Sequence, residues 1–165
     1  MNKEMASSLL NKVIKVDRGG PETNIGMLLG AADDHIIVLT EDDGVIYYQS
    51  QHIKSITHDS KGGLNFNTVI PEDFEFMQEK DFKSCLCNLK YQWVKINRGG
   101  PEKLEGVLDE VTDDYLTIIL NEEIIRVSMF HIRSISYGLK IEKEDEKKDE
   151  EKSTKSSSKN NNTAK

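Results

Sequence analysis

The chain has 165 residues and a formal net charge of −7, from 29 acidic and 22 basic side chains. This length suits one ordinary domain or two very small ones. Eight lysines and seven acidic residues give 140–165 a net charge of +1, so residues 1–139 carry −8. An acidic folded part repels a nucleic-acid backbone unless a basic stripe overrides it, and the sequence contains no such stripe. We therefore expect no nucleic-acid partner.

The sequence also gives no sign of membrane insertion or export. No segment approaches the roughly 20 apolar residues that cross a bilayer. The N-terminal stretch "MNKEMASSLLNKVIKV" lacks the apolar core and cleavage site of a signal peptide. We expect a protein that is made and kept inside the cell and has no membrane partner.

Two stretches of the chain are copies of one unit. Residues 12–40 align with 92–120 at an offset of 80, and residues 48–57 align with 127–136 at an offset of 79. One residue is therefore lost from the intervening loop. The identical pairs include Lys15/Lys95, Arg18/Arg98, Gly26/Gly106, Leu28/Leu108, Asp33/Asp113, Asp34/Asp114, His52/His131, Ile53/Ile132, Ser55/Ser134 and Ile56/Ile135.

The pattern within each unit predicts short β-strands. The first, "KVIKVD" at 12–17, alternates polar and apolar residues as a half-buried strand does. "NIGMLLGA" at 24–31 follows, and its Gly26, matched by Gly106, predicts a bulge, a sharp bend or a close backbone approach. Two aspartates at 33–34 form a turn, and the next strand, "HIIVLT", is rich in β-branched residues.

A tight hairpin and a last strand complete the unit. "EDDG" at 41–44 has the Asp-Gly signature of a hairpin, and "VIYYQ" pairs back across it. "HIKSIT" at 52–57 is the fifth strand. So few strands favour a small curved barrel, because closure removes exposed strand edges. The predicted fold class is mainly β, a tandem duplication of small five-stranded SH3-like or Sm-like barrels, each preceded by a short helix.

The predicted core is the inward face of these strands. Thr117 opposite Ile37 is the weak point of the register, because the other pairs are all apolar. In the first unit the core residues are Val16, Leu28, Ile37, Ile53 and Ile56, and their counterparts are Ile96, Leu108, Thr117, Ile132 and Ile135.

A helix is expected ahead of each unit. Before the second it is predicted over Glu72–Lys90, where apolar residues recur at helical spacing and "PED" gives a start signal. The stretch "NKEMASSLLNK" gives a weaker signal before the first. Cys85 and Cys87 are interpreted as small apolar helix residues, with a redox-active thiol pair as the alternative.

The domain boundaries follow from these elements. The last 26 residues contain almost nothing apolar, so a disordered tail is expected. The predicted divisions are 1–60 for the first helix and barrel, 61–71 for a linker, 72–139 for the second helix and barrel, and 140–165 for the tail.

The motif "RGGPE" occurs at 18–22 and again at 98–102, and we name the two copies the RGGPE loops. A phosphate cradle would need a helix start after the loop, whereas here a strand follows and a glutamate adds negative charge. The glycines and prolines instead predict solvent-facing turns, formed by Gly19, Gly20, Pro21, Gly99, Gly100 and Pro101. The flanking charges form either local ion pairs or a protein-binding surface made of Arg18, Glu22, Arg98 and Glu102.

The sequence contains no catalytic constellation. His52 and His131 have no further ligand at metal-site spacing and are interpreted as polar residues before the last strand. The Asp-Asp pairs are interpreted as turns rather than acid/base carboxylates. We expect no enzyme activity, no metal and no cofactor.

These motifs resemble the spore coat protein B family of endospore-forming bacteria. The resemblance rests on "RGGPE" with a glycine four residues later, the "DDH" and "DDY" turns, and "HIKSIT" and "HIRSIS", in tandem over about residues 10–139. It implies a structural component of the outer spore coat, made in the mother-cell cytoplasm and assembled onto the spore surface. It implies other spore coat proteins as partners, with self-association and a coat-associated kinase as further candidates. In longer family members a Ser-, Lys- and Arg-rich tail is linked to phosphorylation, and the corresponding candidates here are Ser156, Ser157 and Ser158.

A second reading comes from the barrel class itself. Sm-like and SH3-like modules often bind RNA or peptides, and Phe66, Tyr91 and Trp93 are candidate stacking residues for such a ligand. The acidic charge argues against RNA.

Overall fold

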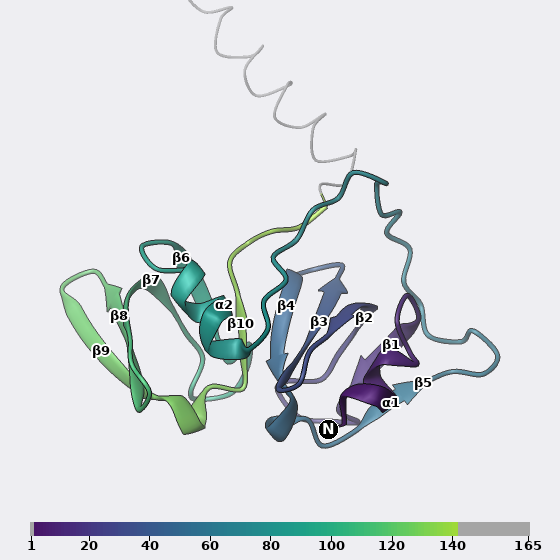
Figure 1. Cartoon of the computed structure of the whole chain (residues 1–165), viewed down its shortest axis with the longest axis horizontal. Helices are drawn as coiled ribbons and strands as arrows, with labels where there is room; N and C mark the ends of the chain where they lie inside the picture. The colour runs from purple at the N-terminus through teal and green to yellow at the C-terminus, as the bar shows by residue number, and fades with distance from the viewer. Residues whose placement is uncertain (1, 142–165) are drawn as a thin grey trace, which may run out of the picture.

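The computed structural model describes residues 2–141. The predicted tail from residue 142 onward, with its three candidate serines, lies outside the described residues. The structure is mainly β, with two short helices and a single sheet of ten antiparallel strands in the order β5-β1-β2-β3-β4-β10-β6-β7-β8-β9. Figure 1 shows the strands of the two sequence copies, called repeat 1 and repeat 2 below, side by side.

The two repeats contain the same elements in the same order. Repeat 1 comprises α1 (Lys3–Ser7), β1 (Val13–Val16), β2 (Asn24–Ala31), β3 (His35–Thr40), β4 (Gly44–Gln49), the 3-10 turn η1 (Ser50–His52) and β5 (Ile56–His58). Repeat 2 comprises α2 (Phe82–Asn88), β6 (Trp93–Ile96), β7 (Leu104–Val111), β8 (Tyr115–Leu120), β9 (Glu123–Ser128), η2 (Met129–His131) and β10 (Ser134–Ser136). Both repeats carry a register shift at the same place, after Leu28 in β2 and after Leu108 in β7. The predicted duplication is therefore confirmed.

The prediction of two separate closed barrels is wrong. The last strand of each repeat pairs with that repeat's first strand, as β5 does with β1 and β10 does with β6. The outer edge of β4 is paired with β10 of the other repeat, through Ile46↔Ser136, Tyr47↔Ile135 and Tyr48↔Ser134. This β4–β10 contact, called the seam, makes one open sheet, because the edge that barrel closure would satisfy is satisfied by the neighbouring repeat.

The seam gives the molecule two unequal cores. In β3 and β4 every residue is buried, so these strands are covered on both faces. One face joins α1 in the first core, which contains Ala6, Leu9, Ile14, Val16, Leu28, Ile36, Val38, Ile46 and Tyr48. The other face enters the second core, which contains Ile37, Leu39, Val45 and Tyr47 beside Phe82, Cys85, Leu86, Leu89, Val94, Ile96, Leu108, Leu116, Ile118, Ile132 and Ile135. Ile37 thus packs in the second core rather than in the core of its own repeat, whereas its counterpart Thr117 is buried but joins neither core.

The second helix is much shorter than predicted. It begins at Phe82, where the side chain of Asp81 caps it by accepting a hydrogen bond from the Ser84 amide at 2.8 Å. Residues 72–81 are non-helical, and Phe74 and Phe76 in this segment pack against the second core. The apolar spacing that suggested a longer helix arises from burial of side chains in this non-helical segment.

Gly26 and Gly106 lie where two backbones approach closely. A Cβ at Gly26 would lie 2.2 Å from the carbonyl oxygen of Leu39, and one at Gly106 would lie 2.6 Å from that of Ile119. Of the options expected from the sequence, close backbone approach is thus present in both repeats.

We predict that Gly26→Ala lowers the free energy of unfolding by about 1–3 kcal/mol, because β2 and β3 must move apart to admit the methyl group. The matched control is Gly19→Ala, since a Cβ there meets nothing within 4 Å. Urea unfolding followed by circular dichroism measures both. Equal stability of the two variants would contradict the close approach.

Candidate functional site: the seam and the RGGPE loops

The residue that precedes each RGGPE loop binds the backbone just before the last strand of the same repeat. Asp17 and Asn97 adopt positive φ angles of 54° and 50°. The Asp17 carboxylate accepts hydrogen bonds from the backbone amides of Lys54 at 2.8 Å and Ser55 at 3.2 Å. Asn97 accepts from the amide of Arg133 at 2.7 Å. The sequence reasoning missed these anchors, although short polar residues that tolerate positive φ stand at both positions.

The loops themselves are turns that touch one another. Gly20 and Gly100 have φ angles of 97° and 81°, which favour glycine. A Cβ on Gly99 would lie 2.5 Å from the carbonyl oxygen of Pro21. Gly19, Gly20 and Pro21 are exposed, as are Gly100 and Pro101, whereas Gly99 is half-buried against the other loop.

The arginines of the two loops lie in different surroundings. The Arg98 side chain is 18% exposed and forms an ion pair with Asp43, in the hairpin that joins β3 to β4. This pair crosses the seam, because the two residues belong to different repeats. Arg18 is exposed and forms no ion pair within residues 2–141.

The glutamates differ in the same way. Glu22 is buried at 6% exposure and accepts a hydrogen bond from the Ser134 hydroxyl of β10 at 2.9 Å. The guanidinium of Arg133 lies 3.7 Å from the same carboxylate. Glu102 is exposed. Arg98 and Glu22 therefore bridge the two repeats, while Arg18 and Glu102 face outward.

Two tyrosines of β4 occupy the centre of the seam. Burial raises the pKa of the Tyr48 hydroxyl to about 12, with the Arg98 charge opposing and the Glu22 charge adding to the shift. The Tyr47 hydroxyl donates a hydrogen bond to the carbonyl of Met77 at 2.7 Å, and burial also raises its pKa. Both side chains are neutral at physiological pH and serve as packing groups.

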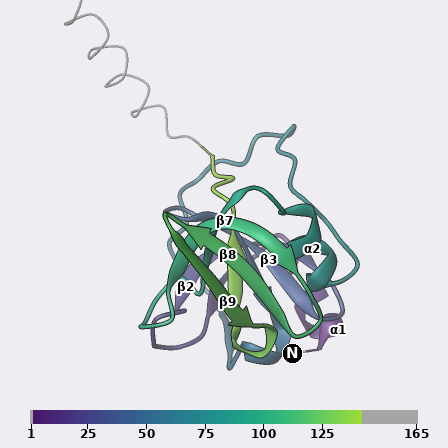
Figure 2. The same ribbon diagram turned by 90° about the vertical axis from the view of Figure 1, so that its left-hand side faces the viewer.

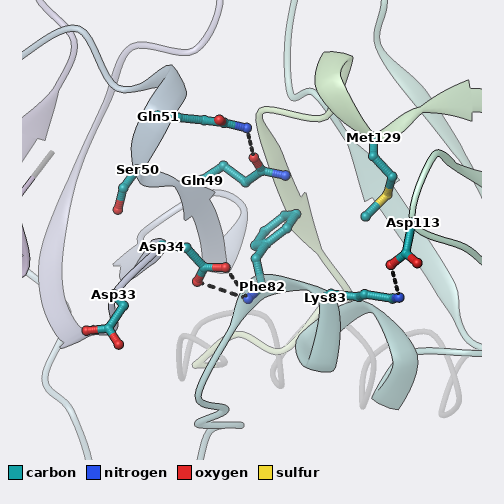
Figure 3. A pocket seen from close by; sticks show the side chains of 9 residues that line it. All are labelled: Asp33, Asp34, Gln49, Ser50, Gln51, Phe82, Lys83, Asp113 and Met129. Carbon is teal, nitrogen blue, oxygen red and sulfur yellow. Dashed lines mark hydrogen bonds and ion pairs between the residues drawn. The ribbon is translucent and has the colours of Figure 1, made fainter.

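The other end of the seam is an open, polar groove of about 480 Å³ (Figure 3). Both carboxylate oxygens of Asp34 accept from the amide of Phe82 at 3.0 Å, and Lys83 pairs with Asp113. The Asp34 carboxylate thus joins the β2–β3 turn of repeat 1 to the start of α2. The other residues lining the groove are Asp33, Gln49, Ser50, Gln51 and Met129.

The histidines and cysteines singled out by the sequence lie in different surroundings. His52 and His131 end the 3-10 turns η1 and η2. Within the described residues no group of three or more side chains is arranged to hold a metal ion. Cys85 is buried, with its sulfur 3.6 Å from Nε2 of His35, whereas Cys87 is exposed. Burial raises the pKa of the Cys85 thiol to about 12.

The candidate stacking residues differ in their exposure. Phe66 is partly buried against the second core, whereas Tyr91 and Trp93 are 74% and 49% exposed. Lys90 lies over the Tyr91 ring at 5.4 Å.

In the part of the chain that the structure describes, no helix is long and apolar enough to cross a bilayer.

The structure defines a class of protein, a tandem-repeat β protein whose two units share one sheet and are joined by strand pairing at the seam. The chain is 38% identical over 141 residues to spore coat protein B of Bacillus subtilis (strain 168). The alignment covers 84% of this chain and 36% of that protein, so the chain spans about a third of its relative's length. The chain is therefore homologous to spore coat protein B. No family model matches the chain, and no solved structure matches it.

We predict that Arg98→Ala and Arg18→Ala differ in their effect on stability. Arg98→Ala should lower the free energy of unfolding by about 1–3 kcal/mol, because it leaves the half-buried Asp43 unpaired. Arg18→Ala should change it by about 0.5 kcal/mol or less, as is usual for an exposed charge. Thermal or urea unfolding of the two variants measures the difference. Equal losses of stability would contradict the different roles that the structure gives to Arg98 and Arg18.

We also predict selective thiol chemistry. A maleimide at mildly alkaline pH should label only Cys87 in the folded protein, because the Cys85 thiol is buried and its raised pKa keeps it protonated. Mass spectrometry should show one added label in the native chain and two after denaturation. The Cys87→Ser variant provides the control, and rapid native labelling of that variant would contradict the burial of Cys85.

Proposed function

We propose that this chain is a structural component of the bacterial spore coat and acts through protein–protein contacts of its two repeats. The observation that carries the proposal is the homology to spore coat protein B over 84% of the chain. On this proposal the chain is made in the mother cell, assembles onto the spore surface with other coat proteins and catalyses no reaction.

The fold supports a building-block role. The two ends of the sheet belong to different repeats, β5 to repeat 1 and β9 to repeat 2 (Figure 1), so one molecule has room for a neighbour at each end. Two weak contacts at fixed spacing give avidity that neither contact has alone. The outward charges Arg18 and Glu102 are the proposed contact residues, and arginine is common where interfaces hold their binding energy.

We predict that the tagged chain, produced from its own promoter in its native host, accumulates late in sporulation and is recovered in the coat extract of purified spores. The double variant Arg18→Ala, Glu102→Ala should melt like the parent but be incorporated several-fold less. The control is Lys61→Ala, Glu72→Ala, which removes the same two charges from exposed positions outside the repeats' sheet.

Two results would contradict the proposal. Accumulation in growing cells with none in the coat fraction would remove the proposed location. Normal incorporation of the Arg18→Ala, Glu102→Ala variant would leave the coat role in place and remove the RGGPE loops from the contact.

A further inference from the structure

Equivalent residues of the two repeats are covered differently. Val45 and Tyr47 on β4 are fully buried. Their counterparts on β9, Ile124 and Arg126, are exposed, Ile124 at 65%. The difference arises because β4 is paired with β10, whereas β9 is the last strand of the sheet and lies nearest the viewer in Figure 2.

The two outermost strands are the counterparts of the two strands at the seam. On β4 the amide of Val45 donates to the carbonyl of Leu139 at 2.7 Å, and the amide of Gln49 donates to that of Arg133 at 2.9 Å. The equivalent amides on β9 belong to Ile124 and Ser128 and lie on the side where the described part of the chain has no further strand. At the opposite end of the sheet, β5 is the counterpart of β10, and no strand of residues 2–141 pairs with its outer side. An unpaired strand edge is a template for another strand.

We propose that the outer edge of β9 pairs with the outer edge of β5 in a second copy of this chain, in the arrangement that β4 and β10 adopt inside each molecule. The proposal deepens the structural role proposed above by naming one partner. Transferring the register of the seam places Ile56 of the second copy opposite Arg126. Ser55 then lies opposite Val127, and Thr57 lies opposite Ile125.

The charges around the two edges are complementary in the same way as those at the seam. The counterparts of the pair Arg98–Asp43 are Arg18 and Glu122, so a positive residue again meets a negative one. None of the residues proposed to meet between copies forms an ion pair through its side chain within residues 2–141.

The second ionic contact transfers equally well. Glu22 meets Arg133 and Ser134 across the seam. The counterparts of these three residues are Glu102, Lys54 and Ser55, with the same charges in the same places. Charge complementarity at both positions supports one specific partner surface rather than nonspecific association.

The first helix has a matching exposed position. Ala6 of α1 and its counterpart Leu86 of α2 are both buried, because each faces its own repeat. Cys85, which faces across the seam, is fully buried, whereas its counterpart Met5 is 39% exposed. In the proposed contact Met5 of the second copy packs near Tyr115, as Cys85 packs near His35.

The contact is head-to-tail, so it repeats. Each molecule uses β9 at one end and β5 at the other, and such an interface builds a ring if the rotation closes and a filament if it does not. Arg126 and Glu123 make β9 more polar than β4, so we expect this contact to be weaker than the seam and reversible.

The test is sedimentation of the purified full chain over a wide range of concentrations. The parent should form multiples of 18.7 kDa as concentration rises. Arg126→Pro removes the outward amide in the middle of β9 and should weaken association at least about tenfold, while the inner ladder with β8 persists. Arg126→Ala keeps that amide and should associate like the parent.

A mixing experiment keeps the test decisive if the proline variant is less stable. Arg126→Pro retains its β5 edge, so adding it to the parent should cap growing assemblies and lower their mean mass. Arg18→Glu should weaken association several-fold, and adding Glu122→Arg to it should restore association.

Four results would overturn the proposal: a parent that stays monomeric, Arg126→Pro that associates like the parent, Arg126→Pro that associates weakly but does not cap, and no rescue by Glu122→Arg. Association in solution by a chain absent from the coat would overturn the proposed function alone.

Discussion

The backbone pairing of β4 with β10 is the interaction on which the rest of the structure depends. Both faces of β4 are buried, so its outward amides have no water to bind. A buried amide without a partner costs about 1–3 kcal/mol, and the carbonyls of Arg133 and Leu139 satisfy the amides of Gln49 and Val45. The order of strands, the shared second core and the position of α2 all follow from this pairing.

Polar contacts at the two ends of the seam fix its register. Strand pairing alone tolerates a slip, because a shift by two residues keeps each side chain on its own face. The contacts Arg98–Asp43 and Glu22–Ser134 lie at one end, and the Asp34 carboxylate binds the start of α2 at the other. A slipped register would break all of them together, so these contacts favour one register over the others.

The sequence predicted the local structure well and the connection between the repeats poorly. The duplication and the bounds of β2 and β3 follow from periodicity and turn chemistry, and close backbone approach at Gly26 was one of three alternatives that the sequence left open. Which strand covers the edge of β4 is a long-range choice, and the same alternation suits a closed barrel or an open sheet. The local signal was the continuous apolar run in "HIIVLT" and "VIYYQ", which is typical of strands buried on both faces.

The candidate site was predicted in part for the same reason. The motif singled out Arg18, Glu22, Arg98 and Glu102. Because the two copies of the motif have the same residues, the sequence cannot show that Arg98 and Glu22 bridge the seam while Arg18 and Glu102 face outward. The anchors Asp17 and Asn97 were missed because their role depends on backbone amides just before the last strand, far away in sequence. The true start of α2 was missed because Phe74 and Met77, which pack against the second core without being helical, continue the helical spacing of Phe82, Cys85 and Leu86.

The unequal cores imply an order of events during synthesis. Every residue of the first core lies before residue 60, so repeat 1 holds a complete set of packing partners while the ribosome is still making repeat 2. The second core cannot form from repeat 2 alone, since it also contains Ile37, Leu39, Val45 and Tyr47 of repeat 1. We infer that the first repeat folds first, and that the second repeat then folds against the face of β3 and β4 that the first repeat leaves exposed.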